Sequence, residues 1–354
     1  MADAAERLCR LARAYGLSSP RAAGELPGGM FLRPLILEAD EGKYVVRGHT
    51  FRRSAATFRF QAETTNAAAD AGVPCPRVLR RLDGRWGEAR DDAFWALHEY
   101  ADGAPMAWPD WQRRKRDPGF LEDLGAWAAS VHNVLACLRP AGSPALSLKL
   151  PPIRFHRLNA CAQSALHAVA SLEQARSRCP RTVRALKAQE IAEAWRLLLA
   201  AAARLRPSAL PRQVVHGDIS PVNLVWRRGV KAPTLIDWDC AHIGLRLYDA
   251  LGDVLLRAPV NVAGRADLDL REVAAYVRGY AGATAHPLTT AERECIPLFL
   301  LARQLEDLRQ RAAVAPQLSE DRDEEYAALI AMRVDVLRQL APFLTGEKGP
   351  GPWM

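Results

Sequence analysis

The chain has 354 residues, of which 49% are hydrophobic and 25% charged, proportions that are typical of a folded globular protein and exclude wholesale disorder. Its longest strongly apolar stretch, Leu197–Ala203, lies between two arginines and is far too short to span a bilayer. Residues 1–16 predict a short amphipathic helix rather than a secretion signal, and the seven cysteines include no closely spaced pair that would indicate a disulfide framework or a zinc site. We therefore expect a cytoplasmic protein with no membrane partner.

The net charge of +8 is unevenly distributed along the chain. Residues 104–213 hold 17 basic and 7 acidic side chains, a net charge of +10, whereas residues 1–103 carry +1 and residues 214–354 carry −3. A basic segment can attract an anionic partner, but the solvated helix faces of an arginine-rich protein give the same pattern. No interleaved aromatic residues or nucleic-acid motif accompany the charge, so we expect no nucleic-acid partner.

Residues 1–103 combine short β-rich runs with turn signals and one helical segment. The turn signal Asp40-Glu41-Gly42 separates an apolar run from Tyr44-Val45-Val46-Arg47 and predicts a β-hairpin. The predicted elements are strands at 35–39, 44–47, 78–82 and 94–100, a turn at Gly28-Gly29, and a helix over 54–71 that ends at Gly72 and Pro74. This order predicts a small, strand-rich region with one helix.

After Asp102-Gly103 the pattern becomes helical. The predicted helices cover 121–138, 181–205, 271–280, 290–313 and 324–340, and a proline-bearing connector covers 140–152. Two short apolar strands, 224–226 and 234–236, interrupt the helical pattern. We therefore predict an α+β protein with a sheet-bearing N-terminal domain at 1–103, a larger helical domain at 104–345 and a flexible tail at 346–354.

One stretch carries the residue types that phosphoryl transfer to an alcohol requires. Asp218 lies in a Gly-flanked loop directly after the apolar run Val214-Val215, where a carboxylate can orient an attacking hydroxyl and accept its proton. Asn223 follows five residues later, and Asp237 lies fourteen residues beyond it, after a predicted hairpin formed by the two short strands. Hard oxygen ligands of this kind suit Mg²⁺.

The motif H-G-D-x-x-x-x-N of residues 216–223, followed by I-D-W-D of residues 236–239, closely resembles the catalytic and metal-binding motifs of the aminoglycoside phosphotransferase and choline kinase family. The members of this family are relatives of the protein kinases. The resemblance implies a bilobal protein-kinase-like fold, with a small antiparallel-sheet N-lobe and a larger helical C-lobe. It also implies ATP- and Mg²⁺-dependent transfer of the γ-phosphate to a hydroxyl of a small molecule, with GTP in place of ATP left open.

The same resemblance assigns roles to the residues of the motif. Asp218 is the expected catalytic base, and Asn223 and Asp237 are the expected Mg²⁺ ligands. His216 would brace the loop. Asp239 stands where the protein kinases have glycine, as is usual in the small-molecule branch.

Upstream segments resemble the nucleotide-binding parts of the family. Arg47 takes the place of the kinase lysine that contacts the nucleotide phosphates, and Val45, on the same face of the strand, would line the adenine pocket. Glu63 on the following helix is expected to pair with Arg47, although a solvated helix glutamate gives the same pattern. Glu99 and Tyr100 lie in a segment that resembles the hinge between the lobes, where backbone groups hydrogen-bond the purine.

Three further segments fit the resemblance. Asp249 in the segment R-L-Y-D is the expected structural anchor of the catalytic loop, and His132 is expected to be a packed structural residue. The loop over residues 26–31 lacks the full glycine pattern of the protein kinases, which favours the small-molecule branch.

The acceptor and two other functions stay open at this point. The candidate acidic residues for an acceptor site are Asp239, Asp253, Glu306 and Asp307, but the basic middle segment disfavours a strongly cationic acceptor. We expect a neutral or mildly charged acceptor, namely an antibiotic or natural product (as in antibiotic resistance), a sugar or an amino alcohol. The alternatives are an atypical protein Ser/Thr kinase, which the short segment after Asp237 disfavours, and a pseudokinase, which the complete set of acid and metal ligands disfavours. The oligomeric state is not indicated.

Overall fold

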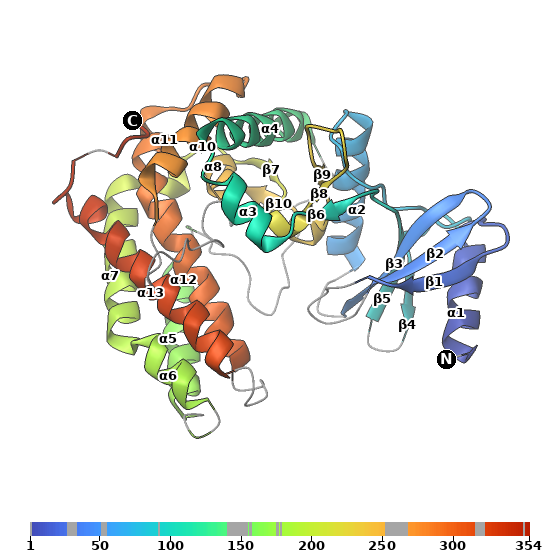
Figure 1. Cartoon of the computed structure of the whole chain (residues 1–354), viewed down its shortest axis with the longest axis horizontal. Coiled ribbons are helices and arrows are strands. Elements are labelled where there is room, and N and C mark those ends of the chain that lie inside the picture. Colours follow the sequence, from blue (N-terminus) through green and yellow to red (C-terminus); the bar gives the residue numbers. More distant parts are fainter. Residues whose placement is uncertain are drawn as a thin grey trace. The chain divides into compact units, whose positions relative to one another are not determined.

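The computed structural model divides the chain into two compact units, which are described separately (Figure 1). The structure describes residues 2–26, 34–50, 55–90, 93–139, 155, 158–174, 177, 179–251, 268–315, 323–349 and 351–354. The sheet unit consists of Met1–Met106, Val134–Lys149 and Val222–Ile243, and the helical unit of Ala107–Asn133, Leu150–Pro221 and Gly244–Met354. The units alternate along the chain, and the domain limits expected from the sequence stay a prediction.

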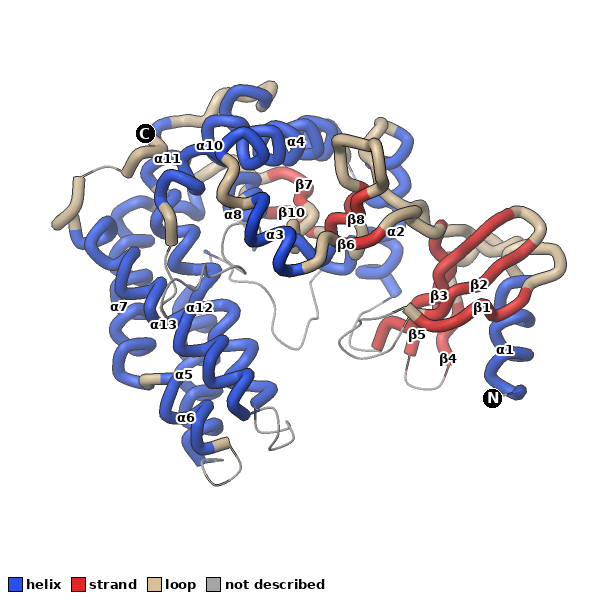
Figure 2. Tube along the Cα trace, viewed as in Figure 1, coloured by secondary structure: helices blue, strands red, loops and turns tan. Residues whose placement is uncertain are grey.

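The sheet unit is built on a five-stranded antiparallel sheet (Figure 2). Its strands, in spatial order, are β1 Arg21–Glu25, β2 Leu35–Ala39, β3 Gly42–Thr50, β5 Ala93–Glu99 and β4 Glu88–Arg90. The predicted hairpin is confirmed: β2 and β3 pair from Leu35↔Val46 to Ala39↔Gly42. Gly42 has a φ of 145°, a backbone conformation that favours glycine, which explains why the turn falls there.

Helices cover both faces of this sheet. Alternate residues of a strand point to opposite faces, so Leu97 and Ala96 of β5 belong to different clusters. Leu97 packs with α1 (Ala2–Arg13), through Leu11 and Ala12, whereas Ala96 packs with α2 (Ala55–Asp70), through Phe58.

The predicted strand at 78–82 is wrong. Only Val78 forms an isolated bridge, with His98 of β5. The side chain of Asn66 on α2 satisfies both backbone groups of Val78: its Nδ2 donates to the Val78 oxygen at 2.9 Å, and its Oδ1 accepts from the Val78 nitrogen at 2.8 Å. The residues on either side of Val78 do bond to β5, but the pairing ends after this bridge because the nitrogens of Arg81 and Leu82 donate elsewhere, to the oxygens of Arg85 and Ala14.

A second, three-stranded sheet in the same unit contains the predicted hairpin. Its order is β6 (Ala104–Pro105), β8 (Leu224–Trp226) and β9 (Thr234–Leu235). Because β8 and β9 pair with β6, a segment that follows the helical residues in sequence belongs to the sheet unit.

The helical unit contains a largely buried helix, α12 (Ile296–Val314), with several other helices packed against it. The others are α3 Trp108–Arg114, α4 Pro118–Cys137, α5 Leu158–Gln174, α6 Pro180–Leu186, α7 Ala188–Leu205, α8 Arg246–Ala250, α10 Leu270–Ala283, α11 Thr290–Glu294 and α13 Asp323–Thr345. Helix α12 packs against α5, α7, α8 and α13, and its residues 296–309 are all buried. A helix enclosed on every side must place its polar residues in the interior, where they need partners.

Two of the predicted helices are each divided into two. The predicted helix 181–205 is interrupted at Lys187, which has a left-handed backbone with φ 45°, so that α6 ends and α7 begins there. The start of α6 is held by Asp323, whose carboxylate accepts from the backbone nitrogens of Arg181 and Thr182, each at 2.9 Å. The predicted helix 290–313 is divided at Cys295, before Pro297.

The last residues contain a packed aromatic side chain. Trp353 is 3% exposed, its ring lies 5.6 Å from that of Phe343, and its backbone oxygen accepts from Arg293. This packing differs from the flexible tail expected at 346–354. Among the described residues, no helix is both long and apolar enough to cross a bilayer. The predicted turn at Gly28-Gly29 and the connector at 140–152 lie outside the described residues.

Candidate active site

In the helical unit, a buried carboxylate holds the loop that carries Asp218. Strand β7 (Gln213–Val215) leads into His216, and Asp249 of α8 accepts from the backbone nitrogens of His216 at 2.9 Å and Gly217 at 2.8 Å. Gly217 has a φ of 87°, where a side chain would be strained. The backbone nitrogen of Asp218 then donates to His216 Nδ1 at 3.2 Å. The structure thus brings His216, Asp218 and Asp249 together.

Asp249 is itself held from the other side. It is 3% exposed, and its Oδ2 lies 3.1 Å from Nε2 of His132 on α4. A buried carboxylate is stable when it accepts several hydrogen bonds, and here the donors come from the loop and from a neighbouring helix. Asp249 therefore fixes the path of the loop backbone rather than facing solvent.

In the sheet unit, Arg47 of β3 lies between two carboxylates of the segment that follows β9. Its Nη2 is 3.0 Å from Asp237 Oδ1 and 3.3 Å from Asp239 Oδ2. Burial by itself lowers the pKa of Arg47, but the two carboxylates outweigh it and raise that pKa, so the guanidinium stays charged. Asp237 has a left-handed backbone, with φ 64° and ψ 59°, which places it at the start of the 3₁₀ turn η4 (Trp238–Cys240).

Two residues that the sequence analysis did not select hold Asp239. His49 of β3 is 3% exposed, and its Nδ1 lies 3.3 Å from Asp239 Oδ2. Gln61 of α2 donates its Nε2 to the backbone oxygen of Asp239. His49 could have been found from its position two residues after Arg47, on the same face of the strand. No sequence signal marked Gln61.

The predicted pair of Arg47 and Glu63 is wrong for this structure. Glu63 accepts instead from Arg59, one turn earlier on α2, at 2.7 Å between Nε and Oε1. The helix turn places these two side chains together, whereas Arg47 is taken by the carboxylates of the segment after β9.

The predicted metal ligands of the sheet unit lie at the end of one hairpin. Leu224 of β8 pairs with Leu235 of β9, and the backbone oxygen of Asn223 accepts from the nitrogen of Ile236 at 3.0 Å. Asn223 therefore lies opposite the residue before Asp237. The Asp237 side chain is 36% exposed, so an ion can reach its carboxylate. The carboxylate oxygen of Asp237 and the amide oxygen of Asn223 are hard ligands of the kind that suits Mg²⁺. No group of three or more His, Cys, Asp or Glu that could hold a metal occurs in the part of the chain that the structure describes, so the remaining ligands would have to be nucleotide oxygens or water.

The residues predicted to contact the purine are partly engaged with the protein. Val45 is 9% exposed on β3. The backbone nitrogen of Glu99 donates to the oxygen of Arg77 at 2.9 Å, and that of Tyr100 donates to the oxygen of Lys43 at 3.2 Å. A purine would therefore have to use other backbone groups of this segment, such as its carbonyl oxygens.

The candidate acidic residues on α12 are neutralised within the helical unit. Glu306 is 5% exposed, accepts from the Tyr248 hydroxyl at 2.8 Å and lies 3.4 Å from Arg303. Asp307 pairs with Arg311 at 2.5 Å and with Arg333 at 3.1 Å. Asp253, the remaining candidate of the helical unit, lies outside the described residues.

Comparisons with known proteins agree with this architecture. The structure is similar to that of a microcompartment-associated aminopropanol kinase, with a TM-score of 0.70, 17% identity, and coverage of 98% of this chain and 99% of the other. It is also similar to an ethanolamine kinase of Plasmodium vivax (TM-score 0.62, 12% identity, 91% and 84% covered) and to an AMP-bound spectinomycin phosphotransferase (TM-score 0.57, 11% identity, 94% and 97% covered). The comparison with curated proteins gave no match.

The sheet unit, the helical unit and the two held loops define the α+β, protein-kinase-like fold that the sequence predicted, and that prediction is confirmed. The family model of the phosphotransferase enzyme family matches residues 31–295, and the chain belongs to this family. It is therefore an enzyme of the phosphotransferase class, within a family of small-molecule kinases.

Proposed function

We propose that this protein is an ATP- and Mg²⁺-dependent kinase that transfers the γ-phosphate to a hydroxyl of a small molecule, with Asp218 as the catalytic base. The observation that carries the proposal is the anchored loop, in which Asp249 accepts from two consecutive backbone nitrogens directly before Asp218. A general base must be held in place to act, and a loop fixed by a buried carboxylate provides that constraint.

The other site residues would bind the metal ion and the nucleotide phosphates. Asn223 and Asp237 would hold Mg²⁺, which supplies charge neutralisation at the phosphate oxygens when bound. Arg47, already charged and oriented by its carboxylate partners, would contact the phosphates of the nucleotide. Asp218 would accept the proton of the acceptor hydroxyl as the new P–O bond forms.

The proposed acceptor is neutral or carries a single positive charge. A polycationic acceptor requires acidic side chains that are free to face it, whereas Glu306 and Asp307 are paired with arginines. The names of the similar structures suggest which compounds to test first: amino alcohols such as ethanolamine and aminopropanol, and then spectinomycin.

The first prediction concerns Asp218. Replacing it with Asn keeps the size of the side chain but removes the base, so we expect kcat to fall by about 10²–10⁴-fold. Protection of the fold by Mg·ATP against thermal unfolding should persist, because the nucleotide contacts lie elsewhere. The measurement is phosphate transfer from labelled ATP to a panel of amino alcohols, choline, sugars, spectinomycin, kanamycin and casein.

The control is Asp110→Asn, which removes an exposed carboxylate that pairs only locally with Arg113. It should leave turnover unchanged. Turnover by Asp218→Asn at the unaltered rate would contradict the assigned base. Transfer to casein alone would favour a protein kinase. Nucleotide protection without transfer to any compound would favour a pseudokinase.

A further inference from the structure

Two glycines bring helices α4 and α10 into backbone contact. A Cβ atom added to Gly125 of α4 would overlap the backbone oxygen of Tyr276 and lie 2.8 Å from the nitrogen of Tyr280, both on α10. A Cβ added to Gly279 of α10 would overlap the backbone of Glu122 on α4. The helices therefore cross at a distance that only glycine permits, and this crossing places Tyr280 next to His132.

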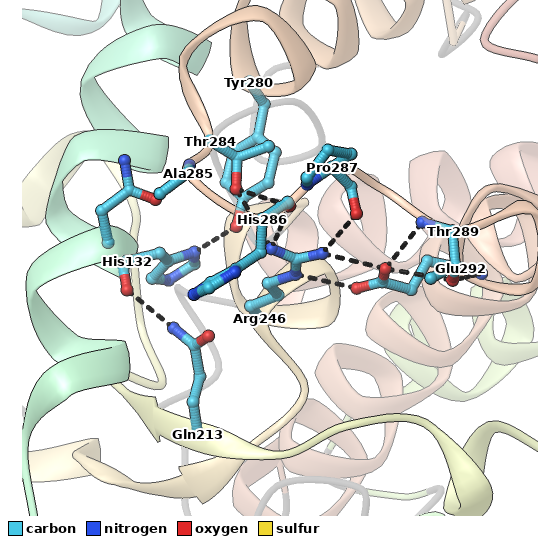
Figure 3. A network of polar contacts seen from close by, with 11 residues as sticks. His132, Gln213, Arg246, Tyr280, Thr284, Ala285, His286, Pro287, Thr289 and Glu292 are labelled. Atoms are coloured by element: carbon cyan, nitrogen blue, oxygen red, sulfur yellow. Dashed lines mark hydrogen bonds and ion pairs between the residues drawn. The ribbon is translucent and has the colours of Figure 1, made fainter.

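His132 makes two buried hydrogen bonds, one from each ring nitrogen. Its Nδ1 lies 2.7 Å from the Tyr280 hydroxyl, and its Nε2 lies 3.1 Å from Asp249 Oδ2. Figure 3 shows His132 and Tyr280 facing each other. His132 is 1% exposed and Tyr280 is fully buried. The backbone oxygen of His132 also accepts from Gln213 Nε2 at 2.9 Å, which ties the end of α4 to β7.

The donors and acceptors of this chain determine the tautomer of His132. Burial raises the pKa of Tyr280 well above its ordinary value, so the phenol keeps its proton. Within the described part of the chain, the acceptor within reach of that proton is His132 Nδ1. If Nδ1 accepts, the ring proton is on Nε2, where it donates to the Asp249 carboxylate.

We propose that Tyr280 and His132 are positioning residues for the reaction proposed above: Tyr280 holds His132 in its Nε2–H tautomer, and His132 thereby holds Asp249 against the backbone of residues 216 and 217. The chain runs from the Tyr280 hydroxyl through the imidazole and the carboxylate to the two loop nitrogens. All three side chains of this chain are buried. Their effect on turnover is exerted through the position of Asp218, and in that respect the inference rests on the proposed function.

A second polar cluster in Figure 3 has a different purpose. Arg246 pairs with Glu292 at 2.8 Å and donates to the backbone oxygens of His286 and Pro287 and to the Thr284 hydroxyl. These contacts join α8 to the segment between α10 and α11. They do not include a bond to the loop of Asp218, so this cluster stabilises the fold without setting the tautomer of His132.

The matched control lies on the same helix. Tyr276 is one turn before Tyr280, is fully buried, and its hydroxyl has no hydrogen-bond partner among the described residues. Tyr276→Phe and Tyr280→Phe each remove one buried hydroxyl from α10, but only the second breaks the chain. We expect Tyr276→Phe to leave turnover and the loop unchanged.

The first test does not depend on activity. In protein labelled with ¹⁵N-histidine, the imidazole nitrogen shifts should show a protonated Nε2 and an unprotonated Nδ1 at His132. Hydrogen exchange of the amides of His216 and Gly217 should be about tenfold faster in Tyr280→Phe and unchanged in Tyr276→Phe. A protonated Nδ1, or equal exchange in the two variants, would overturn the inference.

The second test compares two replacements of His132 by amide side chains, glutamine and asparagine, which differ in the ring nitrogen whose position they can reach. In His132→Gln the side-chain nitrogen can reach the position of Nε2 and donate to Asp249, whereas the shorter His132→Asn cannot. We expect His132→Asn and Tyr280→Phe to lower kcat about tenfold with the KM for ATP changed less than about twofold, and His132→Gln to restore most of the loss. Equal losses in the Gln and Asn variants, or a loss seen only in the KM for ATP, would contradict a positioning role.

The two proposals can fail separately. If Asp218→Asn keeps full turnover, the proposed function is wrong, while the tautomer and the exchange rates still decide whether His132 holds Asp249. If Asp218→Asn is inactive but Tyr280→Phe matches Tyr276→Phe in both exchange and kcat, the function stands and the positioning chain is wrong.

Discussion

The positive charge of Arg47 offsets the repulsion between two nearby carboxylates. Asp237 and Asp239 both lie within 3.3 Å of its Nη2, and His49 adds a second contact to Asp239 at 3.3 Å. A Mg²⁺ ion at Asp237 would compete with Arg47 for that carboxylate, whereas Asp239 would keep its hold on the guanidinium. In this structure Asp239 therefore makes the contact with Arg47 that the sequence resemblance gave to Glu63.

Replacing Asp239 or Glu63 should affect ATP binding to different extents. Asp239→Asn removes a charged partner of Arg47, so we expect the KM for ATP to rise by about tenfold or more, because a hydrogen bond to a charged group contributes about 1.5–3 kcal/mol and each 1.4 kcal/mol is about a factor of ten. Glu63→Gln only breaks a pair with the largely exposed Arg59, so the same KM should change by less than about twofold. Steady-state kinetics with varied ATP at a fixed acceptor concentration is the measurement.

The reverse order of effects would be informative. A larger rise in KM from Glu63→Gln than from Asp239→Asn would mean that Arg47 exchanges partners when the nucleotide binds. Thermal unfolding of both variants serves as the control for folding, since both side chains are partly buried, Glu63 at 26% and Asp239 at 18% exposure.

Among the elements, α4 and α10 make the contact that places Tyr280 beside His132. The two helices carry His132 and Tyr280, and their backbones meet at Gly125 and Gly279. A glycine inside a helix normally costs about 1 kcal/mol relative to alanine. Here the close approach of the two backbones offsets that cost, because a methyl group would force the helices apart.

Two glycines of α10 test this explanation. Gly279→Ala should destabilise the protein by about 1–3 kcal/mol, because the added Cβ overlaps the backbone of Glu122. Gly282→Ala should stabilise it by up to about 1 kcal/mol, because nothing lies within 4 Å of the added Cβ and alanine favours the helix. Urea unfolding at neutral pH measures both. If Gly279→Ala were as stable as Gly282→Ala, the backbone contact of α4 and α10 would not exist in solution.

On the scale of the whole molecule, carboxylates join helices that are far apart in sequence. Glu292 of α11 pairs with Arg246 of α8, Asp323 of α13 accepts from the start of α6, and Glu190 of α7 pairs with Arg338 of α13. Burial raises the pKa of Glu292, but Arg246 and Thr289 outweigh it and lower that pKa overall. The pKa of Glu190 is lowered by its hydrogen bond to Arg338, and that of Asp323 is lowered by its bonds to Thr182 and Arg181, which outweigh burial.

These directions predict the response to acid. A carboxyl group whose pKa is lowered on folding contributes stability that is fully present above its unfolded pKa, about 4, and is lost as the pH falls toward the folded pKa. We expect the urea midpoint of the protein to fall as the pH is lowered from about 5 to about 3. In Glu292→Gln the midpoint should be lower at pH 7 and less dependent on pH below 5.

The control for this prediction is Glu193→Gln. Glu193 is 72% exposed and pairs only with Arg196 on the same helix, so its removal should leave both the midpoint and its pH dependence unchanged. An acid response in Glu292→Gln that equals the unaltered protein's would show that Glu292 does not contribute to it.

Local patterns predicted much of the fold, and they failed where tertiary contacts intervened. The hairpin of β2 and β3 and that of β8 and β9 were predicted from turn signals and β-rich runs, which act over a few residues. The predicted strand at 78–82 is wrong because the backbone nitrogens of Arg81 and Leu82 donate to Arg85 and Ala14 and not to β5. The break at Lys187 was missed because it depends on a left-handed backbone, with φ 45°, at a lysine, a residue type that carries no local turn signal.

The candidate site divides in the same way. The sequence by itself determined the family and predicted the roles of Asp218, Asn223 and Asp237, because their spacing lies within one short segment and its family motif. Only the tertiary structure decided the partners of the surrounding residues. Arg47 pairs with Asp239 and not with Glu63, and His132 bonds both Tyr280 and Asp249. The physical reason is that spacing along a chain encodes contacts over a few residues, whereas the partner of a buried charge depends on which elements pack against it.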